Sequence, residues 1–274
     1  KKNPEKTSVL VYFSEEEIDL AVTGLLENWD EALELASAKK PKSLKKLVSD
    51  IEKAMKNRTS APDIALFGRM LAENPALNID AASQVAHAIS THRVNMDMDF
   101  FTAVDDLQSE EETGSSHMGV TAFNSACFYR YARIDFKQLV KNLDGNEDLA
   151  RKTVVGFLRA ALRAIPSGKQ NSFAAQNPPS FALAVVREDG MSWSLANAFE
   201  TPVTPAREGG FVKKSIEAAD EYWGKLTKIY GNDSITTCLL NMEDDLTLNH
   251  LKGKKENEKE WLNCVLSALT KQEA

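Results

Sequence analysis

The sequence predicts an α+β protein in which a β-rich middle region lies between helical segments. Three observations predict this class. Apolar residues recur at helical spacing near both ends, the middle of the chain alternates short β-like runs with one clear helix, and a long acidic stretch interrupts that middle region. With 274 residues, 43% of them hydrophobic, the chain can form one large domain or two small ones with a real core.

Helices are expected across residues 14–60. Ser14 with Glu17 three positions later is a capping-box pattern, which marks the start of a helix. A second helix with a lysine-rich outer face is expected over residues 43–55, because its apolar residues recur at helical spacing. A short helix is expected over residues 63–71.

The middle region is predicted to run strand, long loop, strand, helix, strand. The corresponding residues are 85–91, 95–119, 126–136, 147–165 and 181–186. The first of these segments can also be interpreted as part of a helix over residues 81–89. This order is typical of a ferredoxin-like or RNA-recognition-motif (RRM) fold that lacks its first strand and helix. The C-terminal part is expected to be helical again, over residues 212–229 and 258–269.

Composition excludes several classes of protein. No apolar run reaches the roughly 18 residues of a transmembrane helix, and the first residues lack the apolar core of a signal peptide. Cys127, Cys238 and Cys264 are scattered without a CxxC pair. This usage fits the reducing cytoplasm and predicts neither a disulfide framework nor a cysteine zinc site.

The net charge of −7 is unevenly distributed. Residues 1–60 are neutral, residues 61–120 carry −8, residues 121–190 carry +4 and residues 191–274 carry −3. A net acidic chain argues at first against binding nucleic acid through bulk positive charge. The basic window after the acidic one shows instead a polarised molecule, so the total charge does not exclude RNA.

Candidate metal and catalytic groups are weak. His87 and His92 are five residues apart, whereas the zinc-protease motif places two histidines four apart with a glutamate between them. A group of aspartates lies in the acidic stretch, at Asp97, Asp99, Asp105 and Asp106. These carboxylates could hold a divalent ion for phosphodiester cleavage, or could form a solvated loop. The residue order shows no nucleophile triad, and no cofactor or metal is predicted.

Two segments have the chemistry of nucleic-acid contacts. Phe100 and Phe101 lie inside the acidic stretch, where paired aromatic residues can anchor the loop to apolar surface or insert between bases. Residues 167–173 (SGKQNSF) lack the spacing of a Walker A motif and precede a predicted strand. Their glycine, lysine and amide side chains instead suit contacts to an RNA backbone.

Seven motifs occur together and in order between about Pro62 and Phe211, and they make the sequence resemble one family. They are DIALFGRM (63–70), AHAISTH (86–92), FTAVDD (101–106), GSSHMG (114–119), FYRYA (128–132), KQNSFAA (169–175) and SLANAFE (194–200). The sequence resembles the CasC family, the backbone subunit of the type I-E CRISPR surveillance complex called Cascade.

The resemblance implies a hand-like architecture. Residues 1–75 would form a helical finger domain, residues 80–94 and 124–211 an RRM-like palm, residues 95–123 a protruding thumb loop, and residues 212–274 a C-terminal helical region. It also implies a non-catalytic subunit that stacks head to tail along CRISPR RNA and presents the guide for pairing with the target DNA strand. Its expected partners are CRISPR RNA, target DNA, copies of itself and other Cascade subunits, with no membrane.

The resemblance and the residue chemistry together indicate a set of contact residues. RNA contacts are expected from Lys169, Gln170, Asn171, Ser172, Phe173, Arg69, Met70, Phe101, Thr102, His117 and Met118. Asp105 and Asp106 are expected at the interface with the basic region of the next copy.

The sequence departs from the family pattern at its start, and two other functions stay open. The family begins with a strand and a basic segment that grips the guide, and neither is found here, so we expect the chain to be a fragment, or its upstream piece to be cut away or supplied by another molecule. The first alternative is a metal-dependent, RNA-cleaving relative of the backbone subunit. The second is a stand-alone module that binds single-stranded RNA.

Overall fold

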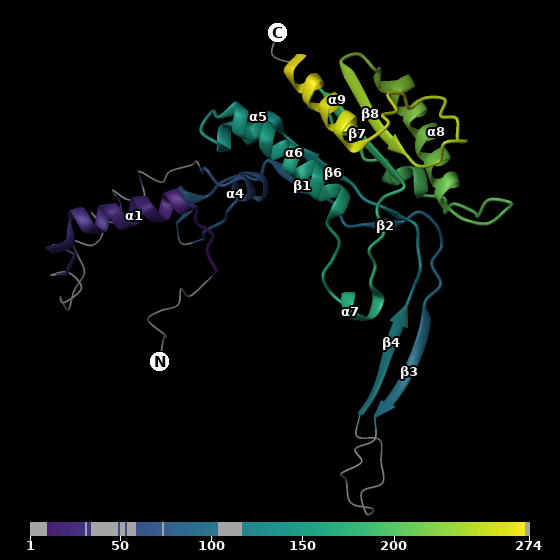
Figure 1. Cartoon of the computed structure of the whole chain (residues 1–274), viewed down its shortest axis with the longest axis horizontal. Coiled ribbons are helices and arrows are strands. Elements are labelled where there is room, and N and C mark those ends of the chain that lie inside the picture. Colours follow the sequence, from purple (N-terminus) through teal and green to yellow (C-terminus); the bar gives the residue numbers. More distant parts are fainter. Residues whose placement is uncertain are drawn as a thin grey trace, which may run out of the picture. The chain divides into compact units, whose positions relative to one another are not determined.

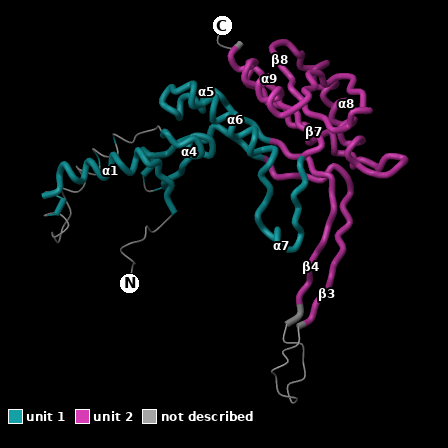
Figure 2. Tube along the Cα trace, in the orientation of Figure 1, with its two compact units in different colours: residues 1–85, 132–178 teal, residues 86–131, 179–274 magenta. Residues whose placement is uncertain are grey.

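The computed structural model describes residues 10–30, 32–33, 49, 53, 59–72, 74–103 and 117–271 (Figure 1). The chain divides into two compact units, each built from two separate stretches of sequence (Figure 2). The first unit contains residues 1–85 and 132–178, and the second contains residues 86–131 and 179–274. Helices and strands occur in both units, which confirms the α+β class. Among the described residues, no helix is long and apolar enough to cross a membrane.

The first unit begins with α1 (Glu15–Glu27), whose start follows the predicted capping box. Glu17 N–H donates to the Ser14 hydroxyl at 3.2 Å, and Ser14 N–H donates to the Glu17 carboxylate at 2.8 Å. These bonds satisfy donors that the first helical turn otherwise leaves open. The helix predicted over residues 43–55 lies almost entirely outside the described residues.

Two short helices follow in the first unit, α4 (Pro62–Phe67) and η1 (Pro75–Leu77). The first helix is shorter than the predicted segment because Gly68 ends it with φ of 77°. A side chain at this position would be strained, and its Cβ would lie 2.7 Å from the Ile79 carbonyl oxygen.

The helix α4 contacts β1 (Ser83–Val85), α5 (Phe136–Asn142) and α6 (Glu147–Arg163). β1 pairs antiparallel with β6 (Ala132–Ile134), and α5 and α6 contact each other. The buried Asn142 amide donates to the carbonyls of Ala65 at 2.9 Å and Asp80 at 2.7 Å. The helix α5 was not predicted, because its first residue, Phe136, was assigned to the preceding strand.

The second unit contains β2 (Ile89–Ser90) paired with β5 (Phe128–Tyr129) and β3 (Asp97–Ala103) paired with β4 (His117–Phe123). The prediction of an irregular loop over residues 95–119 is therefore wrong at both flanks, where the chain forms a hairpin. The polar–apolar alternation over residues 97–100, whose letters are DMDF, is the β-strand signal that the acidic composition masked.

The core of the second unit surrounds β7 (Phe181–Arg187) and β8 (Ile235–Asn241), which pair antiparallel. The helix α9 (Glu258–Lys271) contacts both strands, and α8 (Val212–Tyr230) contacts η2 (Ala196–Phe199). Trp223 of α8 and Leu239 of β8 belong to one buried cluster. The strand β8 was not predicted, since this part of the chain was expected to be helical. All four described sheets have two strands, so a continuous RRM palm sheet stays a prediction.

A disulfide joins β8 to α9. Cys238 and Cys264 form this bond with their Cα atoms 6.1 Å apart. The prediction that excluded disulfides is therefore wrong. The two cysteines are 26 residues apart and come together because α9 packs on β8, a contact that the spacing of cysteines does not reveal.

Candidate nucleic-acid interface

The β3–β4 hairpin displays apolar side chains on both faces. Phe100 faces Val120 across the strands and is 70% exposed, and Met98 lies on the same face and is 63% exposed. Phe101 lies on the opposite face, opposite Gly119, and is 45% exposed. Several exposed apolar side chains on one short hairpin indicate a surface that contacts another molecule.

Gly119 allows the Phe101 ring to lie across the partner strand. A Cβ at position 119 would be 2.4 Å from the Phe101 ring, so any larger residue would push the ring away. An aromatic ring over a cross-strand glycine compensates for the side chain that glycine lacks. Of the two aromatic residues, Phe100 therefore projects further into solvent, and Phe101 is held closer to its own hairpin.

The strand register gives the pairing of the other predicted hairpin residues. Thr102 is exposed and pairs with Met118, and Ala103 pairs with His117. The hairpin thus brings Phe101, Thr102, His117 and Met118 onto adjacent rungs of one ladder. Asp105 and Asp106 lie outside the described residues.

Hydrogen bonds join the two chain segments at the base of the hairpin, residues 91–93 and Cys127. Cys127 N–H donates to His92 Nε2 at 3.1 Å, and Thr91 N–H donates to the Cys127 carbonyl at 2.9 Å. The His92 ring stacks on Phe211, with centroids 3.7 Å apart, and its Nδ1 lies 2.7 Å from the Arg93 carbonyl oxygen. Because Nε2 accepts the Cys127 N–H, the ring hydrogen is assigned to Nδ1, which then donates to the Arg93 carbonyl, and His92 has a structural role.

The predicted backbone-binding segment forms a small exposed loop in the first unit. Its residues Gln170–Phe173 make the four-residue helix α7, flanked by Lys169 and Ala174 with φ of 57° and 46°. The Gln170 amide donates to the Pro166 carbonyl at 2.7 Å, and Lys169 Nζ lies 5.8 Å from the centre of the Phe173 ring. The loop presents Lys169, Asn171 and Ser172 to solvent.

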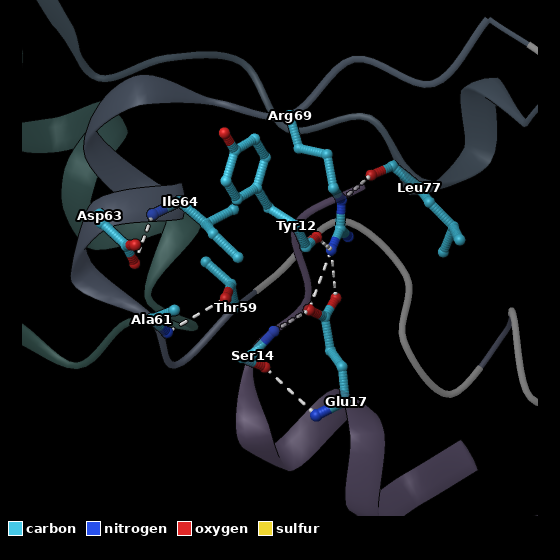
Figure 3. A network of polar contacts seen from close by, with 9 residues as sticks. All are labelled: Tyr12, Ser14, Glu17, Thr59, Ala61, Asp63, Ile64, Arg69 and Leu77. Atoms are coloured by element: carbon cyan, nitrogen blue, oxygen red, sulfur yellow. Dashed lines mark hydrogen bonds and ion pairs between the residues drawn. The ribbon is translucent and has the colours of Figure 1, made fainter. Parts of the chain in front are cut away.

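Arg69 does not lie at the surface. Its side chain is 2% exposed, and Nη1 lies 2.8 Å from Oε1 of Glu17, which is 5% exposed (Figure 3). Nη1 also donates to the Tyr12 carbonyl at 3.1 Å, and Nε donates to the Leu77 carbonyl at 3.0 Å. The guanidinium is thus held inside the first unit, so we do not retain Arg69 as a direct RNA contact. The adjacent Met70 is 83% exposed.

The predicted contact residues therefore fall into two groups. Met70 and residues 169–173 belong to the first unit, and Phe101, Thr102, His117 and Met118 belong to the second. Phe100, His92 and Glu17 are the residues that the predicted site left out. Assigning residues 97–103 to a strand would have put Phe100 on an exposed face, but no sequence signal joins Glu17 to Arg69.

Charged groups with resolved pKa shifts lie elsewhere in the second unit. The ammonium of Lys213 donates to Asp245 at 2.6 Å, and this hydrogen bond raises the pKa of Lys213 and lowers that of Asp245. Burial raises the pKa of the Tyr129 phenol, which accepts a hydrogen bond from Leu195 N–H. Within the described ranges, no cluster of three or more histidine, cysteine or carboxylate groups could hold a metal ion.

Comparisons with known proteins identify related chains. One solved structure, titled "CRISPR RNA-guided surveillance complex, pre-nicking", contains a chain with 32% sequence identity and a TM-score of 0.80, covering 98% of this chain and 72% of that one. Another, titled "CRISPR RNA-guided surveillance complex", contains a chain with 35% identity and a TM-score of 0.67, covering 76% of this chain and 78% of that one. A search of curated proteins finds no match.

The family model for CT1975-like proteins matches residues 1–268. Together with the two structural matches, it confirms the resemblance that the ordered motifs indicated. The chain belongs to the CT1975-like protein family.

Proposed function

We propose that the chain is a non-catalytic, CRISPR RNA-binding backbone subunit of a type I-E Cascade complex. The observation that carries this proposal is the β3–β4 hairpin, which holds Phe100 at 70% exposure and Phe101 at 45%. In a protein that grips single-stranded nucleic acid, such aromatic groups insert between bases and interrupt their stacking. The membership of related chains in RNA-guided surveillance complexes supports the same role.

The exposed loop at residues 169–173 suits contacts to the backbone of the guide RNA. A subunit that binds any guide sequence must contact phosphates and riboses and leave base edges free for pairing. Lys169 supplies a positive charge, and Asn171 and Ser172 supply exposed polar groups. Met70 supplies a further apolar contact from the first unit.

In this proposal copies stack head to tail along the guide, with an RRM-like palm completing each copy. Such a filament needs two different complementary surfaces on every copy. The net charges of −8 over residues 61–120 and +4 over residues 121–190 support contacts between the acidic segment containing Asp105 and Asp106 and the basic region of the next copy. Other Cascade subunits and the target DNA strand are the remaining partners.

The direct test is RNA binding by hairpin variants. Phe100→Ala and Phe101→Ala should each weaken binding of the full chain to a single-stranded guide RNA about 5- to 150-fold, because base stacking on one aromatic residue contributes about 1–3 kcal/mol. Tyr230→Ala is the matched aromatic control, because Tyr230 is 60% exposed and lies outside the proposed contacts, so its replacement should leave RNA binding unchanged. Binding that is unchanged in both hairpin variants would contradict the proposal.

Absence of catalysis is tested separately. Bound RNA should stay intact in the presence of Mg²⁺, because the proposed role requires only positioning of the guide. Cuts at regular spacing that depend on Mg²⁺ and are abolished by Asp105→Ala would instead establish the RNA-cleaving alternative.

A further inference from the structure

The loop that carries Met70 is fixed on both sides of that residue. Arg69 and Ile79 exchange two backbone hydrogen bonds, each 2.9 Å long. Leu71 N–H donates to the Asn78 side-chain oxygen at 2.6 Å. Met70 is thus a solvent-exposed side chain, 83% accessible, between two anchored neighbours.

The Arg69 side chain ties this loop to α1. Its Nη1 donates to Glu17 Oε2 at 2.9 Å, and its guanidinium lies 5.5 Å from the centre of the Phe13 ring. Glu17 also accepts the Ser14 N–H that caps the helix, so one carboxylate serves both the helix start and the Met70 loop (Figure 3). A buried ion pair with these extra bonds holds its geometry, because separating it would leave an unpaired buried charge.

We propose that Arg69 and Glu17 are positioning residues that fix Met70 for its contact with RNA. This inference rests on the proposed RNA-binding function. An exposed side chain on a fixed loop gives up less conformational freedom on binding than one on a loose loop, so fixing it strengthens binding without adding any contact. Arg69 thereby acts on RNA through Met70, although its own side chain is buried.

The expected effect follows from the cost of ordering a loop. Arg69→Lys keeps the positive charge but cannot reproduce the guanidinium bonds to both Leu77 and Tyr12. Glu17→Gln keeps the shape and an acceptor for Ser14 N–H but removes the charge. Each should lower the affinity for RNA about three- to tenfold, the range expected for one side chain that must be ordered on binding.

A double-mutant cycle on the full chain tests the proposal. The probe is a labelled single-stranded guide RNA, and the variants are Met70→Ala, Arg69→Lys and the double variant, with Glu17→Gln replacing Arg69→Lys if the latter fails to fold. If Arg69 acts through Met70, Met70→Ala should cost markedly less affinity in the Arg69→Lys background than in the wild type. Hydrogen exchange at the Leu71 amide should also accelerate in Arg69→Lys before RNA is added.

Arg187→Lys provides the matched control. Arg187 is 7% exposed, pairs with Asp189 and stacks on Trp193, so it is a comparable buried arginine in the second unit. Its replacement should leave the Met70→Ala effect unchanged. Equal costs of Met70→Ala in the wild-type and Arg69→Lys backgrounds would overturn the positioning role. A wild-type chain that binds no RNA would instead refute the proposed function, and the inference with it.

Discussion

Replacing His92 by phenylalanine should loosen the root of the β3–β4 hairpin without removing its aromatic packing. The new ring can still stack on Phe211, which lies 3.7 Å from the imidazole centroid. It cannot accept the Cys127 N–H, now 3.1 Å from Nε2, and it cannot donate to the Arg93 carbonyl. The variant therefore separates the polar contribution of His92 from its packing.

The expected loss in the free energy of unfolding follows from the hydrogen-bonding groups that His92→Phe leaves unpaired. His92 is 9% exposed and Cys127 is half-buried, so water can replace the lost Cys127 hydrogen bond only in part. Such a hydrogen bond contributes about 0.5–1.5 kcal/mol, so the free energy of unfolding should fall by about that amount. His92→Ala also removes the ring contact and should cost about 0.5–1.5 kcal/mol more.

Chemical denaturation and hydrogen exchange of the full chain measure these effects. The Cys127 amide should exchange faster in His92→Phe, while amides in the α8 core stay protected. His87→Phe is the matched control, because His87 is exposed and its replacement should change stability by less than about 0.5 kcal/mol. An unchanged Cys127 exchange rate in His92→Phe would refute a stabilising hydrogen bond between the Cys127 N–H and His92.

Three further predictions concern other parts of the chain. Gly119→Ala should displace the Phe101 ring and weaken RNA binding, seen as altered ring resonances and a lower affinity. The control is Gly156→Ala, at an open position in α6, which should stabilise that helix by up to about 1 kcal/mol. Equal effects of the two variants on the Phe101 resonances and on affinity would contradict the close contact. The Lys213 hydrogen bond lowers the pKa of Asp245, so the ion pair contributes stability above the ordinary aspartate pKa that is lost as the pH falls through the lowered value. Lys213→Met should therefore shift the Asp245 carboxyl titration upward in an NMR experiment, and an unshifted titration would show that the pair does not form in solution. Reduction of Cys238–Cys264 should lower the free energy of unfolding by about 2–4 kcal/mol in denaturation experiments, whereas Cys127→Ser should not abolish this response to reductant.

Local signals in the sequence predicted several of the helices, although α5 (Phe136–Asn142) was missed. The capping box at Ser14 and the amphipathic pattern of α6 (Glu147–Arg163) depend on residues a few positions apart, and both occur as expected. Three strands were missed. Both β3 and its partner β4 overlap a segment that was assigned to one acidic loop, and β8, with its β-branched Ile235, Thr236 and Thr237, lies in a region assigned to helices.

The ordered motifs predicted the family, but side-chain roles depended on tertiary contacts. Arg69 was expected to contact RNA because it lies in the DIALFGRM motif at the end of the expected finger domain, and its burial results from Glu17, a residue 52 positions away. The disulfide has the same origin, since β8 brings Cys238 to α9. In contrast, Phe101 and Thr102 were expected to be accessible to RNA from their own segment alone, and both are exposed on β3.

The central claim is that copies of this chain assemble along a guide RNA. The most direct test is the mass of the complex, measured by multi-angle light scattering with single-stranded RNAs of increasing length. The proposed backbone role predicts that the number of bound copies rises in steps with RNA length, and that the Phe100→Ala/Phe101→Ala double variant loses this assembly. One copy per RNA at every length would contradict it.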